Sequence, residues 1–333
     1  MSAAIQIDRA RAAAAALRKR YHPATGQWDD CWWQSANALD AIIDYMTIAG
    51  SEEYLDVISN TFTQAQLQAT DFLNKYYDDE GWWGIAWLKA FDLIGDQKYL
   101  DVARRIFADM TTGWDDCWGG GVWWTKERSY KNAIPNELFL VLAARLHQRV
   151  EGPEKDSYLE WAQNEWDWFR NTGMINGENL VNDGLDKEGK NNGGITWTYN
   201  QGVILGGLAD LHRATGDTAC LQQAERIADA AISQLCYPNG VLCEPGEQEG
   251  ACDGDQEIFK GIFIRYLAYL NRTLEKPEYA RFIHLNADFL WTHARSADDE
   301  FDLRWTGPFE RSSAQRQAAA QDLLNAAMLS TED

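Results

Sequence analysis

Two adjacent carboxylates, Asp115 and Asp116, lie in a segment whose composition is typical of a binding site. The segment 113–124 also contains four tryptophans and four glycines, which is too many glycines for a helix interior and too many indoles for a solvated loop. Paired carboxylates can divide nucleophile, acid and base roles, indole faces can stack on sugar rings, and glycines let backbone approach a ligand. These residues predict a site for chemistry on a carbohydrate.

The same pair has three other interpretations. It could cap a helix. It could bind calcium, but this ion takes six or more oxygen ligands and the loop supplies few besides the pair. It could belong to the magnesium-binding DDxxD pattern of all-α terpene cyclases, but Cys117, Trp118 and Gly119 follow Asp116, so the third aspartate is missing. We therefore expect no metal here.

Further polar and aromatic residues lie at comparable places in the chain. A polar side chain that opens a buried helix must be satisfied by a neighbour or by a ligand. Helix capping explains some of them equally well, Asp29 and Asp30 above all. The candidates for substrate contact are Asp78, Asp79, Trp82, Trp114, Trp118, Asn132, Asn200, Gln201 and Asp255. The same question applies to the neighbouring residues Asn136, Glu137, Gln256 and Lys260.

Motifs of several other enzyme classes are absent from the sequence. The five histidines lack metal-ligand spacing, and no GxSxG, P-loop or dinucleotide-binding fingerprint occurs. The six cysteines form no CxxC motif, and Cys243 with Cys252 is the one candidate disulfide if the chain is oxidised. We predict neither a cofactor nor a metal site.

Charge and hydropathy narrow the possible partners. The formal charge of −21 argues against nucleic acid or an anionic membrane, because both require a basic face. No stretch approaches 18 uninterrupted apolar residues, so no membrane span is expected. The alanine-rich segment 1–20 lacks the features of a secretory signal. We expect a monomer that is cytoplasmic, or secreted with its leader absent from this sequence.

Apolar residues recur at helical spacing along the whole chain, which predicts an all-α protein. Helices following long Gly/Trp/Asp loops alternate with helices following short turns, at a repeat of roughly fifty residues. We expect twelve helices, approximately at 5–20, 34–49, 52–76, 85–94, 97–111, 133–149, 155–172, 195–215, 218–235, 256–274, 277–293 and 313–329. The segment 77–84, with its two carboxylates and two tryptophans, is expected to be a loop.

This alternation has a simple packing solution. Six inner helices and six outer helices form an (α/α)6 toroid with all the long loops on one rim. Small residues such as Gly202, Gly206, Gly207 and Gly261 would allow close approach of the inner helices. An open superhelical array with the same period is the structural alternative. No linker divides the chain, so we expect residues 1–333 to form a single catalytic domain.

Five segments together resemble glycoside hydrolase family 76, the endo-α-1,6-mannanase family. The resemblance covers the chain from about Trp28 to its C-terminus, and it is the ordered set of motifs that is specific. The segments are Trp114-Asp115-Asp116 with Gly119-Gly120-Gly121, Lys131-Asn132-Ala133-Ile134-Pro135-Asn136-Glu137-Leu138, Tyr199-Asn200-Gln201-Gly202, Asp255-Gln256 with Phe259-Lys260-Gly261-Ile262-Phe263, and Gly307-Pro308-Phe309-Glu310.

The resemblance implies endo-hydrolysis of α-1,6-mannan or α-1,6-linked manno-oligosaccharides with retention of configuration. Asp115 would be the nucleophile and Asp116 the general acid/base, with carboxyl groups about 5 to 5.5 Å apart. Shielding by Trp114, Trp118 and Trp123 would help the acid to keep its proton. Two alternatives stay open, a mannosyl transglycosylase on the same fold and a non-catalytic mannan-binding protein. Many members of the family are secreted, so the lack of a leader leaves the origin of the substrate open.

Overall fold

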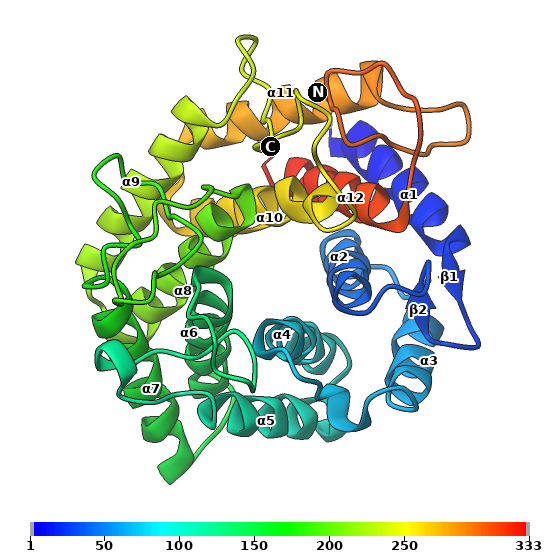
Figure 1. Ribbon diagram of the computed structural model, residues 1–333. Coiled ribbons are helices and arrows are strands. Elements are labelled where there is room, and N and C mark those ends of the chain that lie inside the picture. The colour runs from blue at the N-terminus through cyan, green and yellow to red at the C-terminus, as the bar shows by residue number, and fades with distance from the viewer. Residues whose placement is uncertain (1–2, 331–333) are drawn as a thin grey trace. The chain divides into compact units, whose positions relative to one another are not determined.

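The computed structural model describes residues 3–330 and consists mainly of α-helices (Figure 1). The twelve α-helices are α1 (Ala3–Lys19), α2 (Trp33–Ala49), α3 (Leu55–Ala65), α4 (Tyr77–Ile94), α5 (Gln97–Thr111), α6 (Ala133–His147), α7 (Pro153–Phe169), α8 (Thr198–Thr215), α9 (Thr218–Gln234), α10 (Gln256–Leu274), α11 (Pro277–His293) and α12 (Ala314–Leu329). The short strands β1 (Tyr21–His22) and β2 (Gln27–Trp28) pair as an antiparallel hairpin. Two 3₁₀ turns, η1 (Thr70–Phe72) and η2 (Cys117–Gly119), complete the elements.

The predicted helices are confirmed in number and order, and most of their ends lie within three residues of the prediction. Two predictions were wrong. The helix expected to run to residue 76 ends at Ala65 and is followed by the separate turn η1. The segment 77–84, expected to be a loop, forms the first two turns of α4.

Two glycines account for the wrong prediction of a loop at the start of α4. A Cβ atom on Gly81 would lie 2.8 Å from the Cβ of Leu138, and one on Gly84 would lie 2.8 Å from Cδ2 of Leu142. Both leucines belong to α6. The glycines therefore allow two helices to pack closely and do not mark a turn. The sequence alone does not distinguish these two uses of glycine.

The helices alternate between two kinds of burial, as the sequence predicted. The even-numbered helices are buried on most faces, and in α6 every residue from Ala133 to Leu146 is buried. The odd-numbered helices bury one face, as α5 does with residues such as Tyr99, Val102 and Ile106. This pattern matches the expected division into inner and outer helices.

The chain contains two compact units. Their boundaries in the sequence lie between residues 68 and 69 and, within α9, between residues 231 and 232. Unit 1 contains residues 3–68 and 232–330, and unit 2 contains residues 69–231. In unit 1, α12 packs against α1, α2, α10 and α11, and in unit 2, α6 packs against α4, α5, α7 and α8 (Figure 1). The expectation of a single domain over 1–333 stays a prediction.

Two of the predicted close approaches are observed within the units. A Cβ on Gly261 of α10 would lie 2.4 Å from the Cα of Ala319 in α12. A Cβ on Gly207 of α8 would lie 2.7 Å from Cδ2 of Leu140 in α6. Any side chain at these glycines would push neighbouring helices apart.

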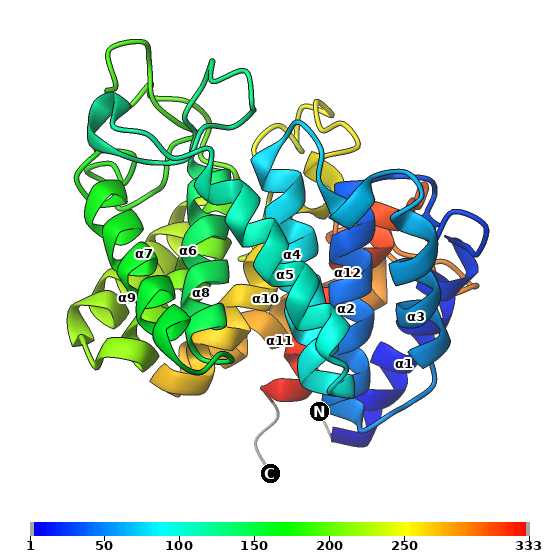
Figure 2. The same cartoon turned by 90° about the horizontal axis from the view of Figure 1, so that it is seen from below.

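Two long loops of unit 2 gather at one end of its helices (Figure 2). The first, residues 112–132, connects α5 to α6, and the second, residues 170–197, connects α7 to α8. Backbone hydrogen bonds hold the second loop against the end of the first loop and the start of α6. The N–H of Leu185 donates to the carbonyl of Lys131, and that of Ala133 donates to the carbonyl of Asp183. The loops therefore hold each other in place beside the adjacent aspartates.

Candidate active site

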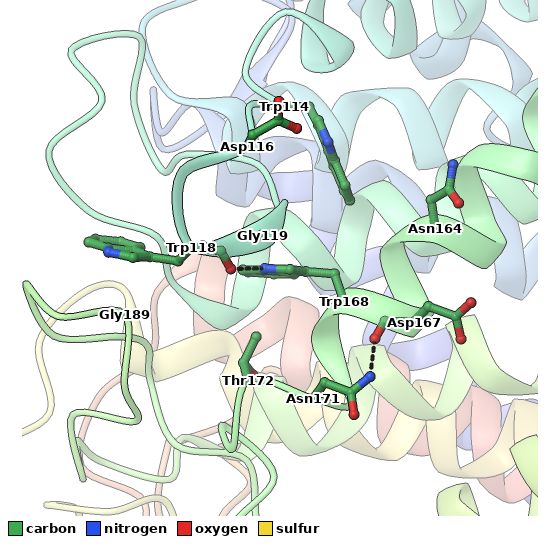
Figure 3. Close-up of a pocket in the computed structure, with 10 residues that line it drawn as sticks. All are labelled: Trp114, Asp116, Trp118, Gly119, Asn164, Asp167, Trp168, Asn171, Thr172 and Gly189. Atoms are coloured by element: carbon green, nitrogen blue, oxygen red, sulfur yellow. Dashed lines mark hydrogen bonds between the residues drawn. The ribbon is translucent and has the colours of Figure 1, made fainter.

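A pocket of about 610 Å³ opens in unit 2 beside the adjacent aspartates (Figure 3). Its walls come from three segments, namely the loop 112–132, the C-terminal part of α7 with the residues after it, and the loop 170–197. The lining residues are Trp114, Asp116, Trp118, Gly119, Asn164, Asp167, Trp168, Asn171, Thr172 and Gly189. Three indoles with several carboxyl and amide groups make a surface suited to a polyhydroxylated ligand.

Asn136 of α6 fixes the shape of the loop that carries the aspartates. Its side-chain oxygen accepts a hydrogen bond from the N–H of Val122 at 2.6 Å, and its Nδ2 donates to the carbonyl of Val122 at 2.9 Å. The same amide group donates to the carbonyl of Asn132 at 2.7 Å. These backbone contacts occupy the Asn136 amide, which the sequence left open as a ligand contact.

The glycines of this loop make room for an indole of the protein itself. Gly120 and Gly121 have positive φ values of 144° and 87°, and a Cβ on Gly121 would lie 2.3 Å from the ring of Trp168. Trp168 also donates from Nε1 to the carbonyl of Trp118 at 3.0 Å. Only Gly119 lines the pocket with open space at the position of a Cβ atom.

The carboxylate of Asp115 is half-buried and surrounded by donors. Lys131 Nζ lies 2.8 Å from Oδ1, which also accepts from the N–H of Cys117 at 3.1 Å. Trp123 Nε1 donates to Oδ2 at 2.7 Å, and Arg128 Nη1 lies 3.4 Å from the same oxygen. Burial acts to raise the pKa of Asp115, but the hydrogen bonds from Lys131, Trp123 and Cys117 outweigh it and hold this pKa below its usual value.

Asp116 has different surroundings from its neighbour. It is exposed and lines the pocket, and no side chain or backbone group within residues 3–330 hydrogen-bonds to its carboxylate. Of the three indoles expected to shield it, Trp123 donates to Asp115, while Trp114 and Trp118 line the same pocket as Asp116. The Asp116 side chain is nevertheless exposed, so the expected shielding of the acid is not present.

The indole of Trp118 lies over a second glycine. Trp118 has a positive φ of 57°, and a Cβ on Gly189 would lie 2.3 Å from Cγ of Trp118. The two long loops of unit 2 thus touch through a tryptophan and a glycine at the pocket wall. Trp114 and Trp118, both predicted substrate contacts, line the pocket with Asp116.

The predicted contacts Asp78 and Asp79 lie in the first turn of α4, where carboxylates stabilise the helix N-terminus. Trp124 Nε1 donates to Asp78 at 2.9 Å, and Asn74 Nδ2 donates to Asp79 at 2.6 Å. Trp82 is 4% exposed and stacks on Tyr199 at a centroid distance of 6.4 Å. These roles are structural, and none of the three residues lines the pocket, so their contact with substrate stays a prediction.

The three predicted amide contacts are buried at the starts of α6 and α8. Gln201 accepts from the N–H of Val181 at 2.7 Å and donates to its carbonyl at 2.8 Å, which holds the loop. Among the described residues, Oδ1 of Asn132 and both polar atoms of the Asn200 side chain have no hydrogen-bond partner. Their contact with substrate stays a prediction.

Asp255, the remaining predicted contact, belongs to unit 1. It immediately precedes α10 and accepts hydrogen bonds from Trp33 Nε1 at 3.3 Å and Gln34 Nε2 at 2.7 Å. These contacts tie the start of α10 to the start of α2. A role of Asp255 in substrate binding stays a prediction.

Several important residues of the site were not predicted. Lys131 and Trp168 contact the backbone around Asp115 and Asp116, and Glu165 is a buried carboxyl of α7. Glu137 of α6, which the sequence left open as a ligand contact, is buried as well. Burial raises the pKa of both glutamates well above the usual value, and the charges of Asp183 and Glu165 add to the effect at Glu137. The one sequence feature that could have indicated them is Lys131, which comes directly before Asn132 and the buried helix α6.

Three negative findings apply to residues 3–330. No group of three or more His, Cys, Asp or Glu side chains is placed to hold a metal ion. None of the helices combines the length and apolarity needed to cross a membrane. All six cysteines, including the candidate pair Cys243 and Cys252, are free thiols.

The helical architecture makes this an all-α protein with an indole-lined pocket beside two adjacent carboxylates. The model of the glycosyl hydrolase family 76 matches residues 8–333, and the chain belongs to this family. The predicted family is thereby confirmed.

Curated relatives and solved structures agree with this assignment. The chain is 31% identical to the mannan endo-1,6-alpha-mannosidase DCW1 of Candida albicans over 284 residues, which cover 75% of this chain and 60% of the relative. It is 28% identical to DCW1 of Saccharomyces cerevisiae, with coverages of 74% and 60%. The chain thus spans less than two thirds of the length of these relatives.

The structure of the α-1,6-mannanase GH76A of a Salegentibacter species matches with a TM-score of 0.87 and 25% identity, over 98% of this chain and 99% of the other. That structure is of an inactive variant, in which two consecutive aspartates are replaced by alanine, bound to alpha-1,6-mannotetrose. Dfg5 of Chaetomium thermophilum matches with a TM-score of 0.86 at 20% identity, over 97% and 90% of the two chains. The predicted all-α, (α/α)6 fold class is confirmed.

Proposed function

We propose that the chain is a retaining endo-α-1,6-mannanase in which Asp115 is the nucleophile and Asp116 the general acid/base. The observation that carries the proposal is the contrast between two adjacent carboxylates, one half-buried among donors and the other exposed in the pocket. Family membership and the names of the relatives support α-1,6-mannan or α-1,6-linked manno-oligosaccharides as substrates. The inactive Salegentibacter variant supports a pair of adjacent aspartates as catalysts.

Each aspartate has surroundings that suit its proposed role. A nucleophile must be ionised, and the hydrogen bonds that lower the pKa of Asp115 favour its carboxylate. An acid/base must exchange protons with the leaving oxygen and with water, and Asp116 is exposed to the pocket. Indoles of Trp114 and Trp118 offer apolar faces for mannose rings.

The proposed reaction has two steps. In the first, an oxygen of Asp115 bonds to the anomeric carbon as the glycosidic bond breaks, and Asp116 gives its proton to the leaving oxygen. In the second, Asp116 takes a proton from water, the water oxygen bonds to the anomeric carbon, and Asp115 leaves as a carboxylate. We propose that residues 1–333 act as one catalytic domain.

The test is hydrolysis of linear α-1,6-manno-oligosaccharides by Asp115→Asn and Asp116→Asn, with the anomer of the first product followed by NMR. The wild type should release the α-anomer first, and each variant should lose about 10⁴-fold in kcat. Full activity in either variant, or β-anomer released first, contradicts the proposal. Longer products at high substrate concentration would instead indicate mannosyl transfer, and tight binding without turnover would indicate a mannan-binding protein.

A further inference from the structure

Lys131 is a buried cation that the proposed reaction does not yet use. Its side chain is 0% exposed, although ammonium groups are costly to remove from water unless they are paired and hydrogen-bonded. It belongs to the loop before α6 and reaches back toward the segment that carries Asp115 and Asp116. A side chain with no exposed surface cannot touch a substrate in the pocket.

The ammonium group is held by the backbone of the aspartate loop. Nζ donates to the carbonyl of Gly120 at 2.6 Å and to that of Cys117 at 2.7 Å, and the carbonyl of Asp115 lies 3.3 Å away. Its third strong contact is Oδ1 of Asp115 at 2.8 Å. Since an ammonium group has three protons, two carbonyls and one carboxylate oxygen use all of them and fix its position.

Indole rings close the space around this ammonium group. Nζ lies 4.8 Å from the ring centroid of Trp123 and 5.9 Å from that of Trp168. Both rings attract a cation through their faces and exclude water. The Lys131 charge therefore acts on Asp115 through a medium that screens it little.

The other carboxyl groups near Lys131 do not compete for its charge. Glu165 lies one turn before Trp168 on α7, and Glu137 lies on α6; both are fully buried, and neither has a hydrogen-bond partner within the described residues. Burial raises the pKa of Glu165, and the opposing effect of Lys131 is too small to prevent it. Asp115 is the one carboxylate among the described residues that is paired with Lys131.

Few other charged or titratable groups face Asp115 and Lys131. From the same loop they are Arg128, Asp116 and Cys117, with Arg128 on the solvent side of the Asp115 carboxylate. From the packed elements, Glu165 of α7 interacts with the charge of Lys131, Glu137 of α6 interacts with Glu165 and Asp183, and Asp167 of α7 lines the pocket. Of these residues, Arg128 hydrogen-bonds to the Asp115 carboxylate through its side chain, and Cys117 does so through its backbone N–H.

We infer that Lys131 is a positioning residue that keeps Asp115 ionised and aimed at the anomeric carbon, and that stabilises the carboxylate when it leaves. The inference rests on the proposed function. When the Asp115 oxygen bonds to the anomeric carbon, its charge is lost while Lys131 remains protonated between its two carbonyls. When water displaces Asp115, the electron pair of the breaking bond returns to the carboxylate beside that ammonium group.

The test compares Lys131→Met, Lys131→Arg and Asp115→Asn in the full chain, using kcat, KM and the pH profile of kcat/KM on a linear α-1,6-manno-oligosaccharide. Lys126→Met is the matched control, because Lys126 lies in the same loop but pairs with Glu80 and Asp109. Circular dichroism establishes folding of every variant. The acidic limb of the profile is the decisive readout, since a purely structural role of Lys131 would not move it.

In Lys131→Met we expect the acidic limb to move to higher pH and kcat to fall about 100-fold, with KM within about twofold of the wild type. Lys131→Arg should keep the limb near its wild-type position because the charge is retained, and Lys126→Met should leave it unmoved. A folded Lys131→Met with the wild-type limb and kcat overturns the inference if Asp115→Asn is inactive. An active Asp115→Asn overturns the proposed function instead.

The inference can be tested even if Lys131→Met does not fold. The neutral Lys131→Gln then replaces it, with the same expectations. The wild type provides a further measurement, because its own acidic limb should lie below the value of about 4 that is usual for aspartate. A wild-type limb clearly above that value overturns the inference.

Discussion

Two buried lysines, one in each unit, have nearly the same surroundings. Lys131 is 0% exposed and Lys260 is 1% exposed, and each pairs with a carboxylate, at 2.8 Å and 2.7 Å respectively. Each also contacts backbone carbonyls, Gly120 and Cys117 for Lys131 and Leu303 for Lys260. Each lies beside an indole, at 4.8 Å from Trp123 and at 4.4 Å from Trp305.

The carboxylates on these lysines differ. The Asp115 side chain is 28% exposed at the edge of the pocket, whereas that of Glu247 is 1% exposed and also accepts from the Tyr237 hydroxyl at 3.0 Å and the N–H of Glu244 at 3.1 Å. The same arrangement of ammonium, carbonyls and indole thus holds a buried carboxylate in unit 1 and a partly exposed one in unit 2. Access of the carboxylate to ligand, rather than the lysine itself, separates a structural site from a functional one.

The largest effect should come from removing each carboxylate. Asp115→Asn should lose about 10⁴-fold in kcat, and it should also lose stability because it leaves the buried Lys131 without a counter-charge. Glu247→Gln should keep its kcat but lose about 3–5 kcal/mol, because it leaves Lys260 buried without a counter-charge. Activity assays and denaturant unfolding of both variants test this prediction. An equal loss of activity in the two variants would contradict the distinction between a functional and a structural carboxylate.

A second prediction concerns the pH dependence of stability. The pKa of Glu165 is raised by burial in the folded chain, so above the unfolded value of about 4.3 the unfolded chain ionises while the folded carboxyl keeps its proton. This group therefore contributes a loss of stability that grows as pH rises from that value toward the folded pKa. Glu165→Gln should remove that loss.

The measurement is the Tm of Glu165→Gln against the wild type at two pH values. We expect a rise of about 2–4 °C at pH 7.5 and none at pH 4, where both states of the wild type carry the proton. Glu247→Gln is the contrasting variant, and it should lower Tm at pH 7.5. A Glu165→Gln chain that is less stable than the wild type at pH 7.5 would mean that Glu165 is ionised beside Lys131.

The smallest effect is expected at the exposed cation on Asp115. The Arg128 side chain is 49% exposed and lies 3.4 Å from the carboxylate, and exposed pairs contribute little because water and salt screen them. Arg128→Gln should reduce kcat/KM about threefold or less, and this difference should shrink further in about 0.5 M salt. A loss as large as that of Lys131→Met would show that burial is not what gives Lys131 its effect.

The sequence was sufficient for those parts of the site that are local in the chain. Asp115, Asp116, Trp114 and Trp118 lie within five residues of one another, so composition alone marked them. The alternation of long and short connections likewise predicted the order of the helices. Lys131, in contrast, belongs to a family motif, but the sequence did not predict its contact with Asp115. That contact spans sixteen residues and depends on how the loop folds back.

Other residues were misjudged because a local signal has more than one physical cause. Gly81 and Gly84 suggested a loop but allow α4 to pack on α6, and Gly121 suggested room for a ligand but admits the ring of Trp168. Glu165 gave no signal, because its burial depends on how α7 packs. Sequence periodicity predicts which face of a helix is buried, but not which polar group on that face lacks a partner.

The most direct test of the account is to trap the covalent intermediate on Asp115. Asp116→Ala should react with an α-1,6-mannobioside that carries a dinitrophenyl leaving group, which needs no acid, and then hydrolyse slowly for lack of a base. Intact mass spectrometry followed by peptide mapping should find a mannobiosyl ester on Asp115, and azide should release it as an α-mannobiosyl azide. An adduct on another residue, or rapid turnover with inversion, would contradict the assignment of Asp115 as the nucleophile.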